Sequence, residues 1–269
     1  MKLLFIGDIV GRAGRDAVKK HLPDLRERLA LDFVVANAEN AAGGFGITAK
    51  ICGELHDAGI DVITTGNHLW DQRDIIGYID TDQRLLRPIN YPKGTPGRGK
   101  GLYQDRRGRK ILVINAMGRV FMDALDDPFS AIAEELARVR LGAGVHFILI
   151  DFHGEATSEK MAMGHFADGK ASLVVGTHSH IPTADAQILA QGTAYQTDAG
   201  MCGDYDSVIG MEKEEPLRRF TRKIPGGRFT PALGEGTFCG VHVETDDKTG
   251  LAVTVSPVRL GPRLREVIP

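Results

Sequence analysis

Several short apolar stretches of this chain each end in a side chain that can bind a metal ion. Two carboxylates, two amides and four imidazoles stand at these ends: Asp8, Glu39, Asn40, Asn67, His68, His153, His178 and His180. In open α/β sheets, ligands bind just beyond the carboxyl ends of the strands. If the stretches are strands of one sheet, these groups gather at one edge. The set is too large for one metal ion and suits two, which favours a two-metal hydrolase.

The strongest local pattern is Gly176-Thr177-His178-Ser179-His180. In an extended segment, residues two apart point to the same side, so both imidazoles can face one site. The turn Gly66-Asn67-His68 adds an amide oxygen and a further imidazole. Asp8 could instead cap a helix. A dinucleotide-binding G-x-G-x-x-G loop is excluded there, because Ile9 occupies the position of the second glycine.

Composition limits the classes of protein to consider. The chain has 269 residues, 42% of them hydrophobic, and a formal net charge of −2, which gives no global electrostatic reason to expect a nucleic-acid or membrane partner. Cys52, Cys202 and Cys239 are widely spaced, which indicates reduced thiols in a reducing compartment. No apolar run is long enough for a signal peptide or a membrane span. We therefore predict a cytoplasmic protein.

The order of elements predicts an α/β fold in one domain, residues 1–269. Strands are expected over 3–6, 33–38 and 61–65, alternating with helices, one of which should kink or split at Pro23. Thr48 and Asp127 are expected helix caps. After about residue 180, turn residues predict two antiparallel hairpins, 186–197 and 238–258. Residues 211–231 are predicted to form a long exposed loop with a short helix.

The site motifs also resemble a known superfamily, the calcineurin-like metallophosphoesterases, whose usual patterns are D-x-H, G-D, G-N-H-[DE], a lone H and G-H-x-H. The corresponding segments occur here in that order: Gly7-Asp8, Asn37-Ala38-Glu39-Asn40, Gly66-Asn67-His68, His153 and Gly176–His180. Two departures stand out. Val10 replaces the His of D-x-H, and Glu39-Asn40 replaces G-D. These departures, together with the segment Glu155–Lys160, are similar to the YmdB-like branch over essentially the whole chain.

This resemblance implies a four-layer α/β/β/α sandwich, the calcineurin-like metallophosphoesterase fold, with two metal ions at the strand ends. It assigns to the first ion Asp8, Glu39, Asn40 and His180. It assigns to the second ion Glu39, Asn67, His153 and His178, so that Glu39 bridges the two. His68 is left to act as the proton donor. Arg119 is a further candidate for contacting the substrate.

The activity implied by the resemblance is hydrolysis of 2′,3′-cyclic nucleotides to nucleoside monophosphates by a metal-activated hydroxide. We expect iron, with manganese or zinc as alternatives, because mixed imidazole and carboxylate ligands suit transition metals better than Ca²⁺ or Mg²⁺. RNA-derived ends remain open as substrates, as does homo-oligomerisation; a membrane partner is not expected. Two other functions also stay open: a phosphomonoesterase, and a metal-bound regulatory protein that acts through partner binding.

Overall fold

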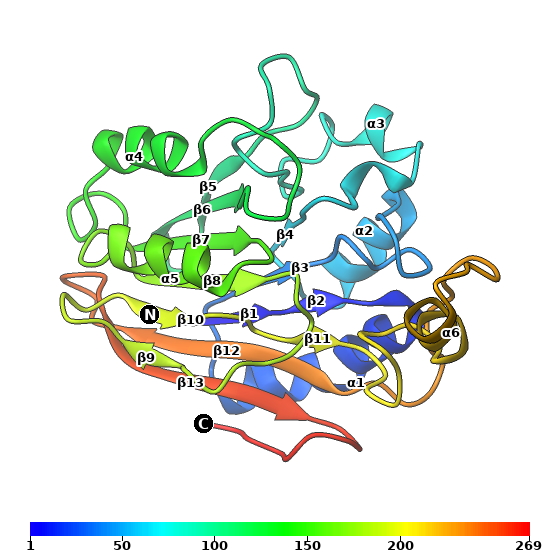
Figure 1. Cartoon of the computed structure of the whole chain (residues 1–269). Coiled ribbons are helices and arrows are strands. Elements are labelled where there is room, and N and C mark those ends of the chain that lie inside the picture. Colours follow the sequence, from blue (N-terminus) through cyan, green and yellow to red (C-terminus); the bar gives the residue numbers. More distant parts are fainter.

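Two β-sheets carry most of the strands in the computed structural model, which describes residues 1–269 (Figure 1). The first sheet has the order β13-β12-β1-β3-β4. Its strands are β1 (Lys2–Ile6), β3 (Phe33–Asn37), β4 (Val62–Thr64), β12 (Phe238–Thr245) and β13 (Ala252–Leu260). The first three are parallel to one another, whereas β12 and β13 form the predicted antiparallel hairpin.

The second sheet has the order β5-β6-β7-β8-β10-β9. Its strands are β5 (Lys100–Gln104), β6 (Lys110–Met117), β7 (Phe147–His153), β8 (Leu173–Thr177), β9 (Gln187–Ile188) and β10 (Ala194–Gln196). Strands β6, β7, β8 and β10 are parallel, and the edge strands are antiparallel to their neighbours. A third, two-stranded sheet pairs β2 (Asp8–Ile9) with β11 (Met201–Cys202).

Six α-helices and one short 3₁₀-helix complete the fold. They are α1 (Gly11–Arg28), α2 (Ala49–Asp57), η1 (Leu69–Asp71), α3 (Ile75–Tyr78), α4 (Pro128–Arg138), α5 (Thr157–Phe166) and α6 (Glu214–Arg222). Both predicted caps are confirmed. The Thr48 hydroxyl accepts a hydrogen bond from the Ile51 N–H, and the Asp127 carboxylate accepts hydrogen bonds from the Phe129 and Ser130 N–H groups in the first turn of α4. The predicted short helix within 211–231 is α6.

Helix α1 runs through Pro23 without a break, so the expected split is wrong. Proline inside a helix removes one backbone hydrogen bond and costs roughly 3 kcal/mol. The apolar face continues on both sides of the proline, however, with Val18, Leu22 and Leu25 all fully buried. Packing of that face against the first sheet outweighs the lost bond.

Alternate residues of the central strands enter different apolar cores. Leu3 and Phe5 of β1 pack with Leu149 and other residues of the second sheet, so this core lies between the sheets. Leu4 and Ile6 point the other way, into a core shared with α1 and α2. A third core joins the second sheet to α4 and α5. Strands buried on both faces explain why the sequence shows continuous apolar runs rather than alternation.

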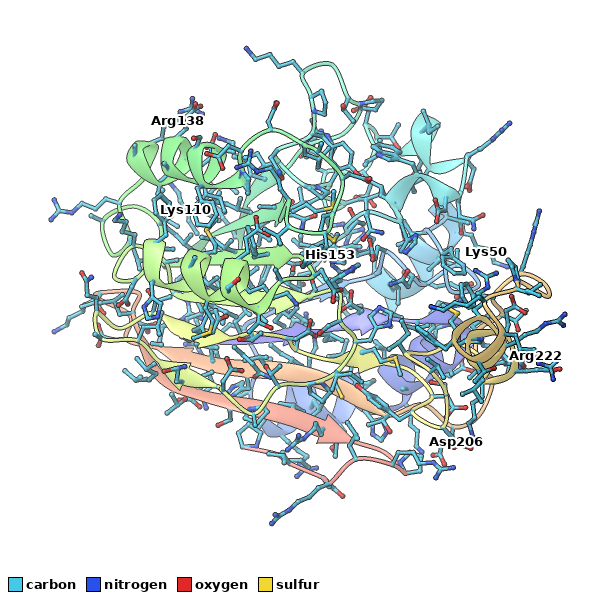
Figure 2. The ribbon with its side chains drawn as sticks, in the orientation of Figure 1. Lys50, Lys110, Arg138, His153, Asp206 and Arg222 are labelled. Carbon is cyan, nitrogen blue, oxygen red and sulfur yellow. The ribbon has the colours of Figure 1, made fainter.

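The charged side chains of Lys50, Arg138 and Arg222 lie at the periphery of the molecule, whereas His153 lies in the interior (Figure 2). None of the helices is both long enough and apolar enough to cross a lipid bilayer. Helix α6 and its flanking loops lie at one edge of the molecule, on the right in Figure 1.

One buried ion pair joins α5 to the segment after β10. The Lys160 ammonium lies 2.8 Å from the Asp198 carboxylate, and the two residues are 1% and 0% exposed. The same carboxylate oxygen accepts hydrogen bonds from the N–H and the hydroxyl of Ser179, at 3.0 and 2.7 Å. The pair therefore fixes the loop that follows β8.

We expect Lys160→Met to destabilise the protein by about 3–5 kcal/mol, because it leaves the Asp198 charge buried without its cation. Urea unfolding measures this loss. Lys20→Met is the control, since it breaks a pair with Glu235 in which both side chains are 60% exposed; its unfolding curve should match that of the wild type. Equal curves for both variants would contradict a stabilising role of the buried pair.

Candidate metal centre

The predicted site residues lie at the carboxyl ends of parallel strands, but of two sheets rather than one. From the first sheet, Asp8 follows β1, Glu39 and Asn40 follow β3, and Asn67 and His68 follow β4; from the second, His153 ends β7, and His178 and His180 follow β8. The expectation of a single sheet edge is therefore wrong. The sheets pack face to face, and this brings their strand ends to the same side of the molecule.

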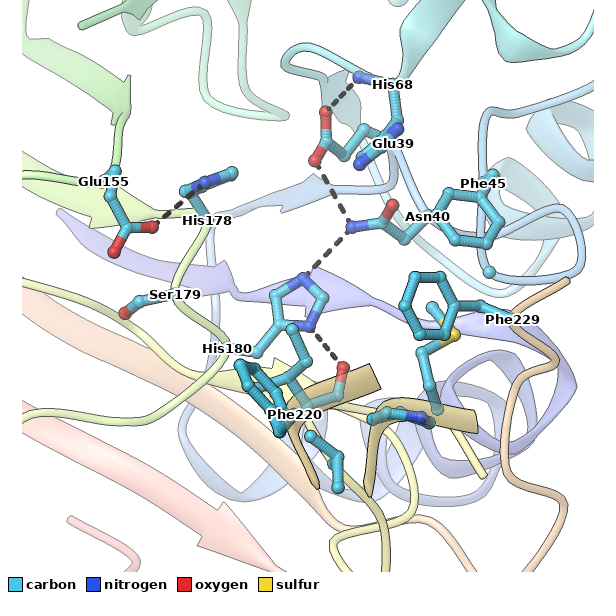
Figure 3. Close-up of a pocket in the computed structure, with 15 residues that line it drawn as sticks. Glu39, Asn40, Phe45, His68, Glu155, His178, Ser179, His180, Phe220 and Phe229 are labelled. Carbon is cyan, nitrogen blue, oxygen red and sulfur yellow. Dashed lines mark hydrogen bonds and ion pairs between the residues drawn. The ribbon is translucent and has the colours of Figure 1, made fainter. Parts of the chain in front are cut away.

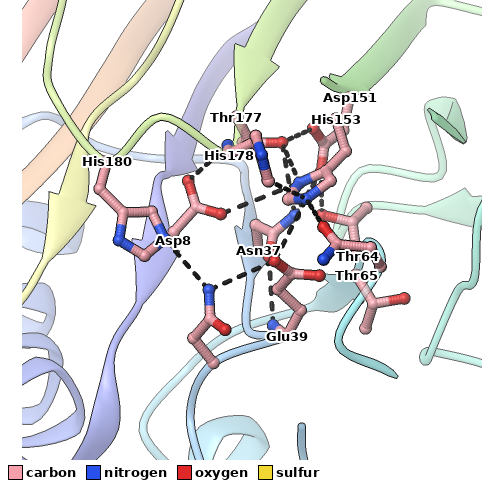
Figure 4. A network of polar contacts seen from close by, with 12 residues as sticks. Asp8, Asn37, Glu39, Thr64, Thr65, Asp151, His153, Thr177, His178 and His180 are labelled. Atoms are coloured by element: carbon pink, nitrogen blue, oxygen red, sulfur yellow. Dashed lines mark hydrogen bonds and ion pairs between the residues drawn. The ribbon is translucent and has the colours of Figure 1, made fainter. Parts of the chain in front are cut away.

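Three of these side chains converge on an imidazole nitrogen of a fourth, His153 (Figure 4). His153 Nε2 lies 2.9 Å from Asn67 Oδ1, 3.1 Å from Glu39 Oε1 and 3.1 Å from His178 Nδ1. Glu39, His153 and His178 offer ligand atoms that all lie within 4.8 Å of one another. Glu39 and His153 are completely buried. These four residues are the set assigned to the second metal ion by the resemblance.

The remaining predicted ligands lie beside this group. Asn40 Nδ2 is 3.1 Å from His180 Nε2 and 3.3 Å from Glu39 Oε1, so Glu39 Oε1 adjoins both halves of the cluster. Asp8 Oδ2 accepts from the His178 N–H at 3.2 Å, whereas Asp8 Oδ1 is buried without a hydrogen-bond partner. A buried carboxylate oxygen without a donor is costly unless a cation satisfies it. The donor set therefore fits bound metal.

Hydrogen bonds to protein acceptors orient the three imidazoles. His180 Nδ1 faces the Ile209 carbonyl at 2.8 Å, and His153 Nδ1 faces the Thr177 hydroxyl at 2.9 Å. His178 Nε2 lies 3.2 Å from a Glu155 carboxylate oxygen. When one ring nitrogen donates to such an acceptor, the other keeps a lone pair for a metal. In each ring that other nitrogen faces the cluster.

A network of buried polar side chains lies behind His153. The Asp151 carboxylate accepts hydrogen bonds from Asn37 Nδ2 at 3.1 Å, Thr64 Oγ1 at 2.5 Å and Thr177 Oγ1 at 2.7 Å. Sequence reasoning missed these residues, because each stands within an apolar strand that looks like core. A polar residue in a strand buried on both faces is the signal that could have found them.

The electrostatics of the cluster depend on burial and on the contact between Glu39 and His153. Burial raises the pKa of Asp8 to about 6. Burial also acts to raise the pKa of Glu39, but the neighbouring His153 outweighs it and lowers that pKa to about 2. In turn Glu39 raises the pKa of His153 to about 9 against the effect of burial. Burial and His153 lower the pKa of His178 to about 3. The charge on His153 thus holds Glu39 as an anion.

The backbone around the cluster is tightly constrained. A Cβ on Gly66 would lie 2.3 Å from His153 Cδ2 and 2.5 Å from Glu39 Oε2, so only glycine permits this close approach. His178 and His180 have φ values of +98° and +66°, a left-handed conformation that non-glycine residues rarely adopt. Such strain persists only where the surroundings enforce it. Ser179 stands between the two histidines, and its hydrogen bonds to the Asp198 carboxylate supply part of that constraint.

His68 adjoins the cluster without joining it. Its N–H donates to Glu39 Oε2 at 2.9 Å, and its Nδ1 lies 2.8 Å from Asp71 Oδ2. Sequence reasoning missed Asp71, although the spacing His-x-x-Asp on the single turn of η1 is a recognisable signal. Arg119 instead forms an ion pair with Asp127 at 3.2 Å and does not line the cavity described below.

A cavity of about 490 Å³ opens over the cluster (Figure 3). Its volume is in the range of small-ligand sites. Glu39, Asn40, His68, His178 and His180 line one side of it. The rest of the lining comes mainly from apolar residues: Phe45, Val208, Ile209, Met211, Pro216, Phe220 and Phe229.

Comparison with known proteins identifies relatives along the whole chain. A family model described as "YmdB-like protein" matches residues 4–258. The 2′,3′-cyclic-nucleotide 2′-phosphodiesterase of Bacillus subtilis (strain 168) is 47% identical over 258 residues, which cover 96% of each chain. The family match and this similarity confirm the prediction of a phosphoric diester hydrolase.

Two solved structures share the architecture. A protein from Thermus thermophilus superposes with a TM-score of 0.89 at 43% identity, covering 97% of this chain and 99% of that one. A phosphatase from Mycoplasma pneumoniae gives a TM-score of 0.89 at 32% identity, covering 97% and 93%. The mixed α/β fold is therefore confirmed, and the chain belongs to the YmdB-like family.

Proposed function

We propose that this protein is a metal-dependent phosphodiesterase that opens 2′,3′-cyclic nucleotides at the P–O2′ bond to give nucleoside 3′-monophosphates. The convergence of Asn67, Glu39 and His178 on His153 Nε2, each within 3.1 Å, is the observation that carries this proposal. The name of the Bacillus subtilis relative supports the choice of substrate. RNA-derived ends that carry the same cyclic phosphate are included in the proposed substrate class.

Two metal ions are proposed, held by the residues that the resemblance assigned. One would be held by Asp8, Glu39, Asn40 and His180, and the other by Glu39, Asn67, His153 and His178. The mixture of carboxylate, amide and imidazole donors supports iron, with manganese or zinc as alternatives. When bound, the ions supply Lewis acidity, which activates water and neutralises charge on the phosphate.

His68 is proposed to deliver the proton that the leaving oxygen needs. As water adds to phosphorus and the P–O2′ bond breaks, His68 protonates O2′. Asp71 accepts from Nδ1 at 2.8 Å and so directs the other ring nitrogen away from itself. His68 lines the cavity, and its ring packs against Phe45 with 5.1 Å between ring centroids. Asp71 is therefore a positioning residue for the proton donor.

We also propose that residues 1–269 form one domain with four layers, α/β/β/α. The three large apolar cores support this arrangement, one between the sheets and one between each sheet and its helices. No composition break or long linker divides the chain.

The decisive test of the function is an assay of the purified protein with 2′,3′-cyclic nucleotides, 3′,5′-cyclic nucleotides and phosphomonoesters under iron, manganese and zinc. Preference for monoesters would overturn the proposal.

The metal content is the first expectation. Elemental analysis should find about two transition-metal ions per chain. Glu39→Ala should deplete both, because its carboxylate adjoins both halves of the cluster, whereas His180→Ala should mainly remove one. His165→Ala, on the exposed side of α5, is the control and should keep both. Full activity in native protein that contains no metal would contradict the model.

The role of Asn40 gives a second expectation. Asn40→Ala should lower the metal content by about one ion per chain, since its amide adjoins His180 Nε2 and no imidazole stands at Val10. Asn40→Asp keeps an oxygen donor and should retain both ions. Elemental analysis with circular dichroism separates metal loss from unfolding. If Asn40→Ala retains both ions and full activity, Asn40 is a structural residue.

His68→Gln should keep the metal content but lower kcat on 2′,3′-cyclic nucleotides by roughly 10²–10⁴-fold, the usual contribution of a positioned general acid. The loss should be much smaller on bis-p-nitrophenyl phosphate, because its leaving group needs little protonation. Steady-state kinetics on the two substrates provide the comparison. An equal loss on both would mean that His68 acts on the metal site or the phosphoryl oxygens instead.

A further inference from the structure

The cavity over the metal-binding side chains has an apolar side that the proposed chemistry does not use. Three phenylalanines from separate segments stand on it: Phe45 after the glycine-rich loop, Phe220 on α6, and Phe229 after α6 (Figure 3). We call these three residues the aromatic wall. Val208, Ile209 and Met211 are further apolar residues that line the cavity.

The three rings differ in what already covers them. Phe45 and Phe229 pack against the small cluster of Val10, Met201 and Met211. The Arg219 guanidinium also covers Phe229, 4.0 Å from the ring centroid. Phe220 belongs to no apolar cluster and is 76% exposed, although it lines the cavity. An aromatic ring with its surface open to a ligand cavity is suited to stack on a flat partner.

The wall is fixed relative to the metal-binding side chains. The Ile209 carbonyl accepts from His180 Nδ1 at 2.8 Å, so the segment that leads to α6 is bonded to a proposed metal ligand. The polar residues of the cavity, among them Glu155 and Ser179, lie with the metal-binding side chains (Figure 3). A ligand with its phosphate at the metal-binding side therefore meets an apolar, aromatic surface at its other end.

We propose that the aromatic wall is the subsite for the nucleobase of the substrate, and that the base stacks on Phe220. This inference rests on the proposed function, because it places the cyclic phosphate at the metal-binding side chains. The phenylalanines of the wall carry no hydrogen-bonding group, and the Arg219 guanidinium over Phe229 already donates to Glu215 and to the Gly227 carbonyl. Binding therefore depends on the area of stacking. All four bases are then accepted, and purines bind more tightly than pyrimidines.

Phe220→Ala tests this subsite. We expect it to raise KM for 2′,3′-cyclic AMP about tenfold, the scale of one lost base–aromatic stack, with kcat nearly unchanged. Glycerol 1,2-cyclic phosphate has the same five-membered phosphodiester but no base, and its kinetics should not change. Isothermal titration calorimetry gives a readout without turnover: Kd for adenosine 3′-monophosphate should rise about tenfold, and Kd for inorganic phosphate should stay constant.

Two variants serve as matched controls. Phe121→Ala removes a phenylalanine that is 88% exposed and outside the cavity, and Leu217→Ala changes an exposed residue of α6 that does not line it. Both should behave as wild type, while Phe220→Trp should retain nucleotide affinity. Equal effects of Phe220→Ala on the nucleotide and on glycerol 1,2-cyclic phosphate would overturn the subsite. Absence of turnover of any cyclic phosphodiester by the wild type would overturn the proposed function instead, and the calorimetric comparison would still decide the subsite.

Discussion

The Asp151 carboxylate is the point at which the two sheets and the site are joined. It is completely buried on β7 and accepts hydrogen bonds from Asn37 and Thr64 of the first sheet and from Thr177 of the second. Burial raises the pKa of Asp151, and these donors oppose that shift by favouring the carboxylate. Thr177 in turn contacts His153 Nδ1. One side chain therefore fixes the relative position of the strand ends and the orientation of the central imidazole.

Apolar packing alone would not set that position. Side chains of both sheets share the inter-sheet core, but hydrophobic contact is non-directional and does not by itself specify where the polar groups at the strand ends lie. Hydrogen bonds to a buried carboxylate are directional, and breaking one leaves an unsatisfied group in the interior. The packed strands provide most of the stability. The polar network sets the relative position of the strand ends, and metal binding requires that the ligand atoms be placed to within tenths of an ångström.

The sequence was enough to locate the ligand candidates, because each stands at the end of an apolar run and strand ends are a local property. The sequence also predicted the caps at Thr48 and Asp127 and the two hairpins, because helix caps and hairpin turns are likewise local properties. The assignment of each strand to its sheet could not be predicted, since β1 pairs with β12 at the far end of the chain. The partnership of Lys160 with Asp198 likewise depends on tertiary packing rather than on spacing.

Val10 links the departure from the D-x-H pattern to the shape of the cavity. Its side chain is 2% exposed and packs with Met201 and Met211. A Cβ on Gly210 would lie only 2.7 Å from Val10 Cγ1, so the segment around Ile209 approaches this valine as closely as glycine allows. A charged or metal-bound imidazole in place of Val10 would put a polar ring into that apolar contact. Val10, which stands where the D-x-H pattern has its histidine, thus anchors the segment whose Ile209 carbonyl orients His180 and whose continuation carries Phe220 and Phe229.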